Sequence, residues 1–254
     1  NTSFVMKQNE DFIFGMRAVM EAITAGKDID KILLRKDLSG ELSAELFQLL
    51  KDRPDIVVSR VPLERINRIT RKNHQGVVAF LSPISYYSLE SLVPQLYEDG
   101  KVPFIVLLDG VTDVRNFGAI ARTCECAGVD AIVIPEKNSV SVNGDAVKTS
   151  AGALLHLPVA RVKNLNRAIR FLKDSGLTIV GSTEKADADY VTFDYSVPVA
   201  IVMGAEETGI SVDNLSLCDY LASIPMSGNV NSLNVSVAAG IMIYEVVRQR
   251  RNLQ

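Results

Sequence analysis

The sequence predicts an α/β protein in which a small α/β domain precedes a larger domain built on a parallel, doubly wound sheet. Segments with helical periodicity alternate with segments of strand character along the chain. Residues 103–110 (PFIVLLDG) are almost continuously apolar, as expected for a strand that is buried on both faces. Near residue 102, short mixed segments give way to longer apolar ones, and this change divides the chain into the two domains.

The N-terminal domain is expected over residues 1–83 and consists of short helices and strands. Gly26 is expected to end the first helix, and Pro54 the second, because proline cannot continue a helix. In chain order, the pattern predicts a helix to Gly26, a strand over 31–35, a helix over 43–53, a strand over 55–61, a helix through the basic segment to Lys72 and a strand over 74–82.

Residues 84–102 are predicted to form a linker with one short helix, because prolines stand at 83, 94 and 103 and the segment lacks a strong core pattern. The second domain is expected over residues 103–254. Its pattern predicts strands over 103–109, 130–135, 177–183, 197–204 and 221–225, with helices over 114–127 and 164–176 and a terminal helix before Arg250.

The composition excludes several classes of protein. The net charge is −3, and no run of about 18 apolar residues is present, so a membrane span is not expected. The N-terminus shows no signal-peptide pattern, which favours the cytoplasm, and residues 1–5 precede the first methionine, Met6. Three cysteines and two histidines form no metal-binding pattern, so no metal is expected. With only two histidines, the chain offers few candidates for a Ser-His-Asp triad.

One basic run interrupts this acidic balance. Residues 60–72 (RVPLERINRITRK) carry five positive charges and one negative charge. Such a run weakly indicates RNA binding. The alternative is a solvated helix face, because Arg65, Arg68 and Arg71 recur at helical spacing. Charge alone favours this alternative.

Three glycine-bearing loops follow strands of the second domain, where parallel sheets bind their ligands. They are DGVTDVRNFG, MGAEETGIS and PMSGNVNSLN. The second has P-loop glycine spacing, but Ile210 stands where the phosphate-binding lysine is required. No G-x-G-x-x-G follows a strand either. The loops therefore suit a flat ligand without strongly anionic phosphates.

These loops resemble the three motifs of the SpoU/TrmH branch of the SPOUT RNA methyltransferases. The matching segments are NFGAIARTCECAG after LDGVTDV, then VMGAEETGIS, then IPMSGNVNSLNVSVAAGIMIYE. FGMRAVMEAITAG and NHQGVVAF are similar to the substrate-binding domain that many members carry. The resemblance covers about residues 12–250, and the third motif is the most specific. The first motif reads DVRN instead of the common DPxN, which places Arg115 beside Asn116.

The resemblance implies a trefoil knot in the C-terminal domain, S-adenosylmethionine as cofactor and a homodimer with both active sites at its interface. It implies transfer of a methyl group to a ribose 2′-hydroxyl of RNA. The positions that match the family's cofactor contacts, or lie beside them, are Thr183, Gly204, Ile224, Met226 and Leu233. The alternative for Ile224 and Leu233 is a role in the core, and both roles are compatible.

The same match assigns the catalytic set, which is Asn116, Arg122, Glu206, Ser232 and Asn234. Arg122 is expected to anchor the phosphate beside the target ribose, because guanidinium is planar and permanently charged. A role as general base conflicts with its high pKa. The alternatives are a salt bridge from Arg122 to Glu125 or Asp113, and a helix cap at Ser232.

The expected partner is structured RNA. A two-domain chain of this pattern looks most like the bacterial 23S rRNA guanosine-2′-O-methyltransferases, with tRNA as the alternative substrate and an inactive RNA-binding assembly factor as a third reading. The residues expected to contact RNA are Arg65, Arg68, Arg71, Lys72 and His74.

Overall fold

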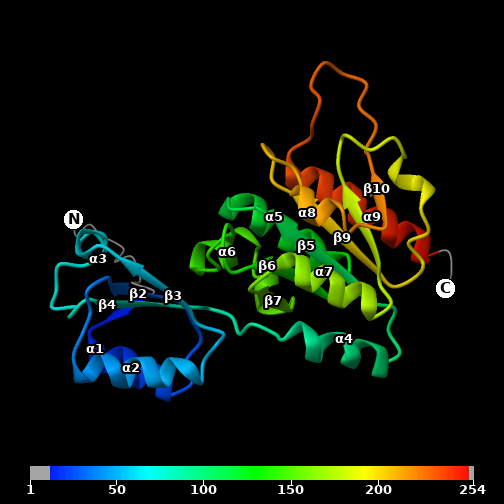
Figure 1. The fold of residues 1–254 in the computed structure, drawn as a ribbon. Coiled ribbons are helices and arrows are strands. Elements are labelled where there is room, and N and C mark those ends of the chain that lie inside the picture. Colours follow the sequence, from blue (N-terminus) through cyan, green and yellow to red (C-terminus); the bar gives the residue numbers. More distant parts are fainter. Residues whose placement is uncertain (1–11, 252–254) are drawn as a thin grey trace, which may run out of the picture. The chain divides into compact units, whose positions relative to one another are not determined.

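The computed structural model describes residues 12–251, and the chain divides between Ile84 and Ser85 into two compact units (Figure 1). Each unit has its own sheet and its own buried apolar cluster. The sheet of the first unit is mixed, and the sheet of the second is parallel throughout. The predicted α/β class and the parallel sheet of the second domain are therefore confirmed.

The first unit is a four-stranded sheet in the order β1-β4-β2-β3, with its two longer helices packed on one face. Its strands are β1 (Phe12–Phe14), β2 (Ile29–Arg35), β3 (Val57–Val61) and β4 (Val77–Leu81), and its longer helices are α1 (Met16–Thr24) and α2 (Glu41–Lys51). Val19, Ile23 and Leu46 pack from these helices against Ile32 and Leu34 of the central strand. The pattern missed β1, because three residues are too few to show alternation.

The helix predicted through the basic run is mostly absent. α3 spans only Leu63–Asn67, and Ile66 is its single buried residue. Arg60 lies in β3, with its guanidinium 5.0 Å from the centre of the Phe47 ring. The residues that follow α3 form turns. Their helical spacing was therefore coincidental, because one buried side chain gives too little packing to hold a longer helix.

The segment predicted as a linker contains α4 (Leu89–Glu98). Leu89 and Val93 are buried in the core of the second unit. The amide of Tyr87 donates to the carbonyl of Val159 at 2.9 Å. Most of this segment therefore packs as part of the second unit.

The second unit is a six-stranded sheet in the order β10-β8-β9-β5-β6-β7. Its strands are β5 (Phe104–Asp109), β6 (Ala131–Pro135), β7 (Val159–Val162), β8 (Thr178–Ser182), β9 (Val199–Gly204) and β10 (Tyr220–Ala222). The chain runs outward from β5 through β6 to β7 and then crosses to the other side of β5. This reversal puts the carboxyl ends of β5 and β9 side by side, at the position where doubly wound sheets bind ligands.

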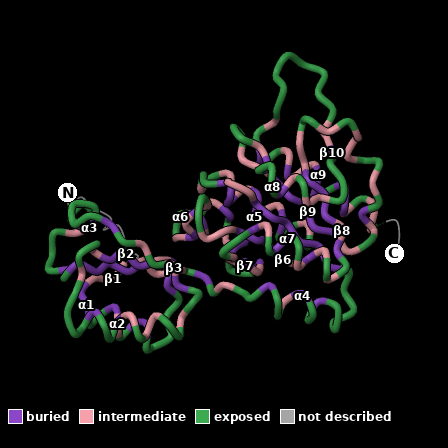
Figure 2. Tube along the Cα trace, in the orientation of Figure 1, coloured by how far each residue is buried: buried purple, intermediate pink, exposed green. Residues whose placement is uncertain are grey.

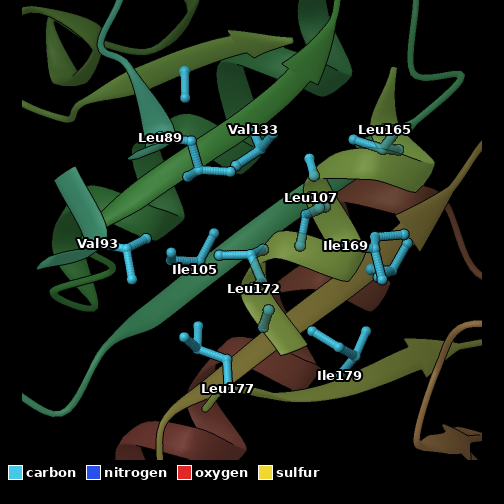
Figure 3. Packing of buried hydrophobic residues seen from close by; sticks show 14 of the residues in the cluster. Leu89, Val93, Ile105, Leu107, Val133, Leu165, Ile169, Leu172, Leu177 and Ile179 are labelled. Carbon is cyan, nitrogen blue, oxygen red and sulfur yellow. The ribbon is translucent and has the colours of Figure 1, made fainter. Parts of the chain in front are cut away.

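Helices cover both faces of this sheet. They are α5 (Val114–Cys126), α6 (Gly144–Thr149), α7 (Leu165–Asp174), α8 (Val212–Leu215) and α9 (Val235–Arg251), with short 3₁₀ turns at Ala153–Leu155 and Tyr190–Thr192. Figure 3 shows α4 and α7 packed over Ile105 and Leu107 of β5. Side chains alternate along a strand, so Phe104, Val106 and Leu108 face the opposite layer, in which α5 packs against α9.

The segment between β10 and α9 is drawn green in Figure 2, because residues 225–232 are exposed. This segment carries the third motif. The trefoil knot expected here stays a prediction. Among the described residues, no helix is long and apolar enough to cross a membrane, and no group of three or more metal-binding side chains occurs.

The arginines at the end of α9 have different structural roles. Arg248 forms a 2.7 Å ion pair with Glu245, a buried residue three positions earlier on α9. The guanidinium of Arg250 donates to four backbone carbonyls, those of Val102, Pro103, Tyr195 and Val197, at 2.8–3.2 Å. Arg250 therefore fastens the end of α9 to the segments that precede β5 and β9.

Candidate active site

The loops that follow β5 and β9 are joined by one carboxylate. Asp109, the last residue of β5, accepts hydrogen bonds at Oδ2 from the amide of Ser211, the hydroxyl of Ser211 and the amide nitrogen of Asn214, at 2.8, 2.8 and 2.9 Å. These donors lie more than 100 residues away in sequence. Asp109 therefore fixes the second-motif loop against the end of β5. Sequence reasoning missed Asp109 and Asn214, although an acidic residue at a strand end was a usable signal.

Gly204 is the point at which the second-motif loop folds back on its strand. A Cβ at this position would lie 2.2 Å from the carbonyl carbon of Gly209 and 2.2 Å from the amide nitrogen of Ile210. The turn is closed by the amide of Gly209, which donates to the carbonyl of Ala205 at 2.8 Å. Only glycine fits here, because real Cβ atoms do not approach backbone atoms this closely.

Three of the five predicted catalytic residues meet in one hydrogen-bonded cluster. The amide nitrogen of Asn234 donates to Oδ1 of Asn116 at 3.0 Å and also to Oε1 of Glu206. The same Glu206 oxygen accepts from the backbone amide of Val235 at 3.2 Å. One side chain from each motif contributes, so the Asn116–Glu206–Asn234 cluster ties together the three loops.

Asn234 also caps α9. Its Oδ1 accepts from the backbone amide of Ser236 at 2.9 Å and from the hydroxyl of Ser236 at 2.5 Å. The suggestion that Ser232 caps this helix is therefore wrong. At the first motif, Asp113 caps α5 by accepting from the amide of Asn116 at 2.9 Å. Both asparagines of the cluster thus sit at helix N-termini, where the backbone is fixed.

One cavity lies beside this cluster, and its walls include all five residues predicted to contact the cofactor. They are Thr183, Gly204, Ile224, Met226 and Leu233. Ser232 and Glu206 line the same cavity. This mixture of apolar side chains with hydroxyl, carboxylate and backbone groups suits a flat base joined to a polar ribose and amino-acid tail.

Arg122 is not part of the cluster. Its side chain is exposed on α5, and it makes no hydrogen bond or ion pair with any residue that the structure describes. The suggested salt bridge to Glu125 or Asp113 is therefore not formed. Arg115, seven residues earlier on the same helix, is exposed too. Residues seven apart share a helix face, so α5 presents two arginines to the surroundings of this unit.

The residues predicted to bind RNA differ in their availability. Arg65, Arg68, Arg71 and Lys72 are exposed. His74 is only 9% exposed, and its Nδ1 accepts from the amide of Gly76 at 3.0 Å. Its Nε2 therefore carries the proton and donates to Oδ1 of Asn67 at 2.8 Å. His74 holds the turn before β4, and we remove it from the RNA-contacting set.

Comparisons with known proteins find relatives of both units. The model of the SpoU rRNA methylase family matches residues 103–244, and a model described as RNA 2′-O ribose methyltransferase substrate binding matches residues 12–87. A protein of Staphylococcus saprophyticus assigned to the TrmH family of tRNA/rRNA methyltransferases is 40% identical, over 95% of this chain and 96% of its own length. A Bacillus subtilis protein with the same assignment, YacO, is 35% identical over 96% and 98%.

Two solved structures with S-adenosylmethionine bound are similar as well. One is the SpoU methyltransferase AviRb from Streptomyces viridochromogenes, with 25% identity, a TM-score of 0.60 and coverage of 97% of this chain and 95% of that chain. The other is an rRNA methyltransferase from Sinorhizobium meliloti, with 29% identity, a TM-score of 0.60 and coverage of 96% and 87%.

Fold, site and likeness together define an RNA 2′-O-ribose methyltransferase that uses S-adenosylmethionine. Within that class, the chain belongs to the SpoU/TrmH family. The residues present fit the cofactor, because the cavity beside the cluster offers apolar cover, hydroxyl groups and a glycine that leaves the backbone open to close approach.

Replacing Gly204 with alanine is expected to weaken S-adenosylmethionine binding at least about tenfold, because the new methyl group must displace backbone atoms that line the cavity. Isothermal titration calorimetry measures this. Gly240→Ala on α9 is the matched control, since a Cβ there meets only a Thr123 methyl group at 4.0 Å. Equal affinities for the two variants would show that the second-motif loop does not hold the cofactor.

Proposed function

We propose that this protein methylates the ribose 2′-hydroxyl of a guanosine in 23S rRNA, in the cytoplasm and as a homodimer. The observation that carries the proposal is the Asn116–Glu206–Asn234 cluster, which adjoins the cavity assigned to the cofactor through Glu206. Family membership gives the reaction. The choice of rRNA is supported by the rRNA methyltransferase from Sinorhizobium meliloti, which is similar over 96% of this chain and therefore over both domains.

The cluster is proposed to orient the acceptor ribose. When bound, S-adenosylmethionine supplies an electrophilic methyl group on a good leaving group, so the main task of the protein is alignment. Glu206 holds the amide of Asn234, which fixes the direction in which that amide presents its groups. Asn116 is held by the same amide. Ser232 and the five cofactor-contact residues are proposed to hold the cofactor from the other walls.

The homodimer is proposed to complete the site. Arg122 is exposed outside the cluster, and α9 beside it exposes an apolar stripe, with Val237 51% and Tyr244 50% exposed seven residues apart. α5 and α9 pack against each other. A second copy that covers this stripe would bring an arginine to a neighbouring site. At that site, the unpaired guanidinium would bind a phosphate of the RNA substrate.

Transfer to RNA can be tested directly. Purified protein is incubated with S-adenosylmethionine labelled in its methyl group and total RNA from a strain that lacks the gene. Label is expected in 23S rRNA. Label in tRNA alone would select the other substrate, and no label in any RNA would contradict the proposed reaction on these RNAs.

The N-terminal unit is proposed to contact RNA phosphates through Arg65, Arg68 and Arg71. Replacing all three with alanine is expected to weaken RNA binding and reduce the salt slope of log Kobs by about 2 to 3, because each phosphate contact contributes roughly 0.7 to 0.9. Filter binding at several salt concentrations measures this. The control removes three charges from the α1 and α2 side, Arg17, Lys27 and Lys51. Equal losses of RNA affinity in the two triple variants would show that the basic run is an ordinary solvated surface.

A further inference from the structure

A second cavity adjoins the one assigned to the cofactor. The two cavities share Ala205, Glu206 and Val235 in their walls. The second one extends away from these residues, between the loops that follow β5, β6 and β9, and Asn138 and Glu207 line it. A ribose at the shared wall would therefore have its 2′-hydroxyl beside the first cavity and its base in the second.

The second cavity is unusual for a protein that binds a polyanion. Its described lining contains three carboxylates, Asp113, Glu206 and Glu207, and no lysine or arginine. Such a lining repels phosphate groups. Carboxylates beside RNA weaken binding unless they accept hydrogen bonds from it. An RNA group held in this cavity is therefore expected to present hydrogen-bond donors to the carboxylates.

Only one of the three carboxylates has no other task in the structure. Asp113 caps α5, and Glu206 holds Asn234 and Val235. Glu207 is exposed and makes no hydrogen bond or ion pair with the described residues. Its side chain can therefore accept a ligand without breaking the site.

We propose that the second cavity holds the target base and that the carboxylate of Glu207 selects guanine, an inference that rests on the proposed function. The Watson–Crick edge of guanine carries two adjacent donors, N1–H and the N2 amino group. A carboxylate accepts both through its two oxygens, as it does from the paired donors of arginine. Adenine and cytosine present one donor beside an acceptor, and uracil one donor between two acceptors. These bases would place an acceptor against the carboxylate.

Asn138 offers the complementary group. It lies in the left-handed region of the backbone, with φ of 55°, at the turn after β6. Its side-chain amide is able to donate to O6, the acceptor next to N1 of guanine. Enzymes that act on nucleotides commonly turn the target base out of its stack and read its Watson–Crick edge in this way.

The first part of the test identifies the methylated nucleoside. Total RNA labelled by the wild-type protein is digested to nucleosides and separated by liquid chromatography. The label is expected in 2′-O-methylguanosine. Label in another 2′-O-methylated nucleoside would overturn the guanine assignment while leaving methyl transfer to RNA established. Absence of label would instead count against the proposed function.

The second part tests Glu207 itself on a synthetic RNA that contains the mapped target as guanosine or as inosine, which lacks the N2 amino group. Wild-type protein is expected to prefer guanosine in kcat/KM by about 5- to 150-fold, the usual range for a bidentate base contact. Glu207→Gln should lose most of that preference while binding S-adenosylmethionine normally. Glu98→Gln on the exposed side of α4 is the matched control and should keep it. A Glu207→Gln protein that still prefers guanosine to the wild-type extent would refute the proposal.

Discussion

Replacing Arg122 with alanine is expected to slow methyl transfer by at least about 100-fold and to change S-adenosylmethionine affinity less than about twofold. The side chain is exposed, makes no hydrogen bond with Asn116 or Asn234, and does not line the cofactor cavity. Its effect must therefore come through RNA. Loss of one well-placed charged donor at a reacting group costs on the order of 10² to 10³ in rate. Single-turnover kinetics and calorimetry on the same preparation separate the two quantities.

A lysine at position 122 should recover only part of the rate, because a compact ammonium cannot replace the planar, bidentate guanidinium. Mixed dimers test whether the arginine acts on the partner's site. Arg122→Ala and Asn234→Ala subunits, each inactive alone, should regain activity when mixed, since one site of the mixed dimer has both groups intact. No recovery after demonstrated subunit exchange would place Arg122 in the site of its own chain. A large loss of cofactor binding in Arg122→Ala would contradict the role given to it.

The fold was predictable where packing follows local pattern. Residues 104–108 are apolar throughout and form most of the central strand β5, and the stripe that includes Phe117, Ile120 and Cys124 became the buried face of α5. The helix predicted through the basic run was wrong for the opposite reason. Its arginines recur at helical spacing, but Ile66 is the only buried residue of α3, and charge spacing without an apolar face does not hold a helix.

The site was predictable through its motifs and unpredictable in its contacts. Asn116 and Asn234 were assigned correctly to one region, yet their hydrogen bond joins positions 118 residues apart. Local sequence patterns do not show which residues far apart in the chain meet in the fold. Asp109 escaped notice for the same reason, because its donors lie in another loop. His74 was misassigned because neighbouring positive charges suggested RNA, whereas its burial beside Asn67 depends on the fold of the whole unit.

Replacing Arg250 with alanine is expected to lower the free energy of unfolding of the second unit by about 3 kcal/mol. Hydrogen bonds from a charged group each contribute about 1.5 to 3 kcal/mol, and carbonyls left without a donor add to the loss. Solvent at the exposed carbonyls of Val102 and Val197 offsets part of this. Burial lowers the pKa of Arg250, which the charge of Asp130 partly opposes. The group nevertheless stays charged at neutral pH, because arginine titrates so high.

Urea unfolding followed by circular dichroism measures the change. Arg251→Ala is a close control, because it removes the same charge from an exposed neighbour and should alter stability by less than about 0.5 kcal/mol. Arg250→Lys should lose most of the stabilisation as well, since one ammonium cannot reach four carbonyls that lie on two separate segments. If Arg250→Ala and Arg251→Ala were equally stable, the end of α9 would be held by Gln249 and its bonds to Phe193 and Tyr195 instead.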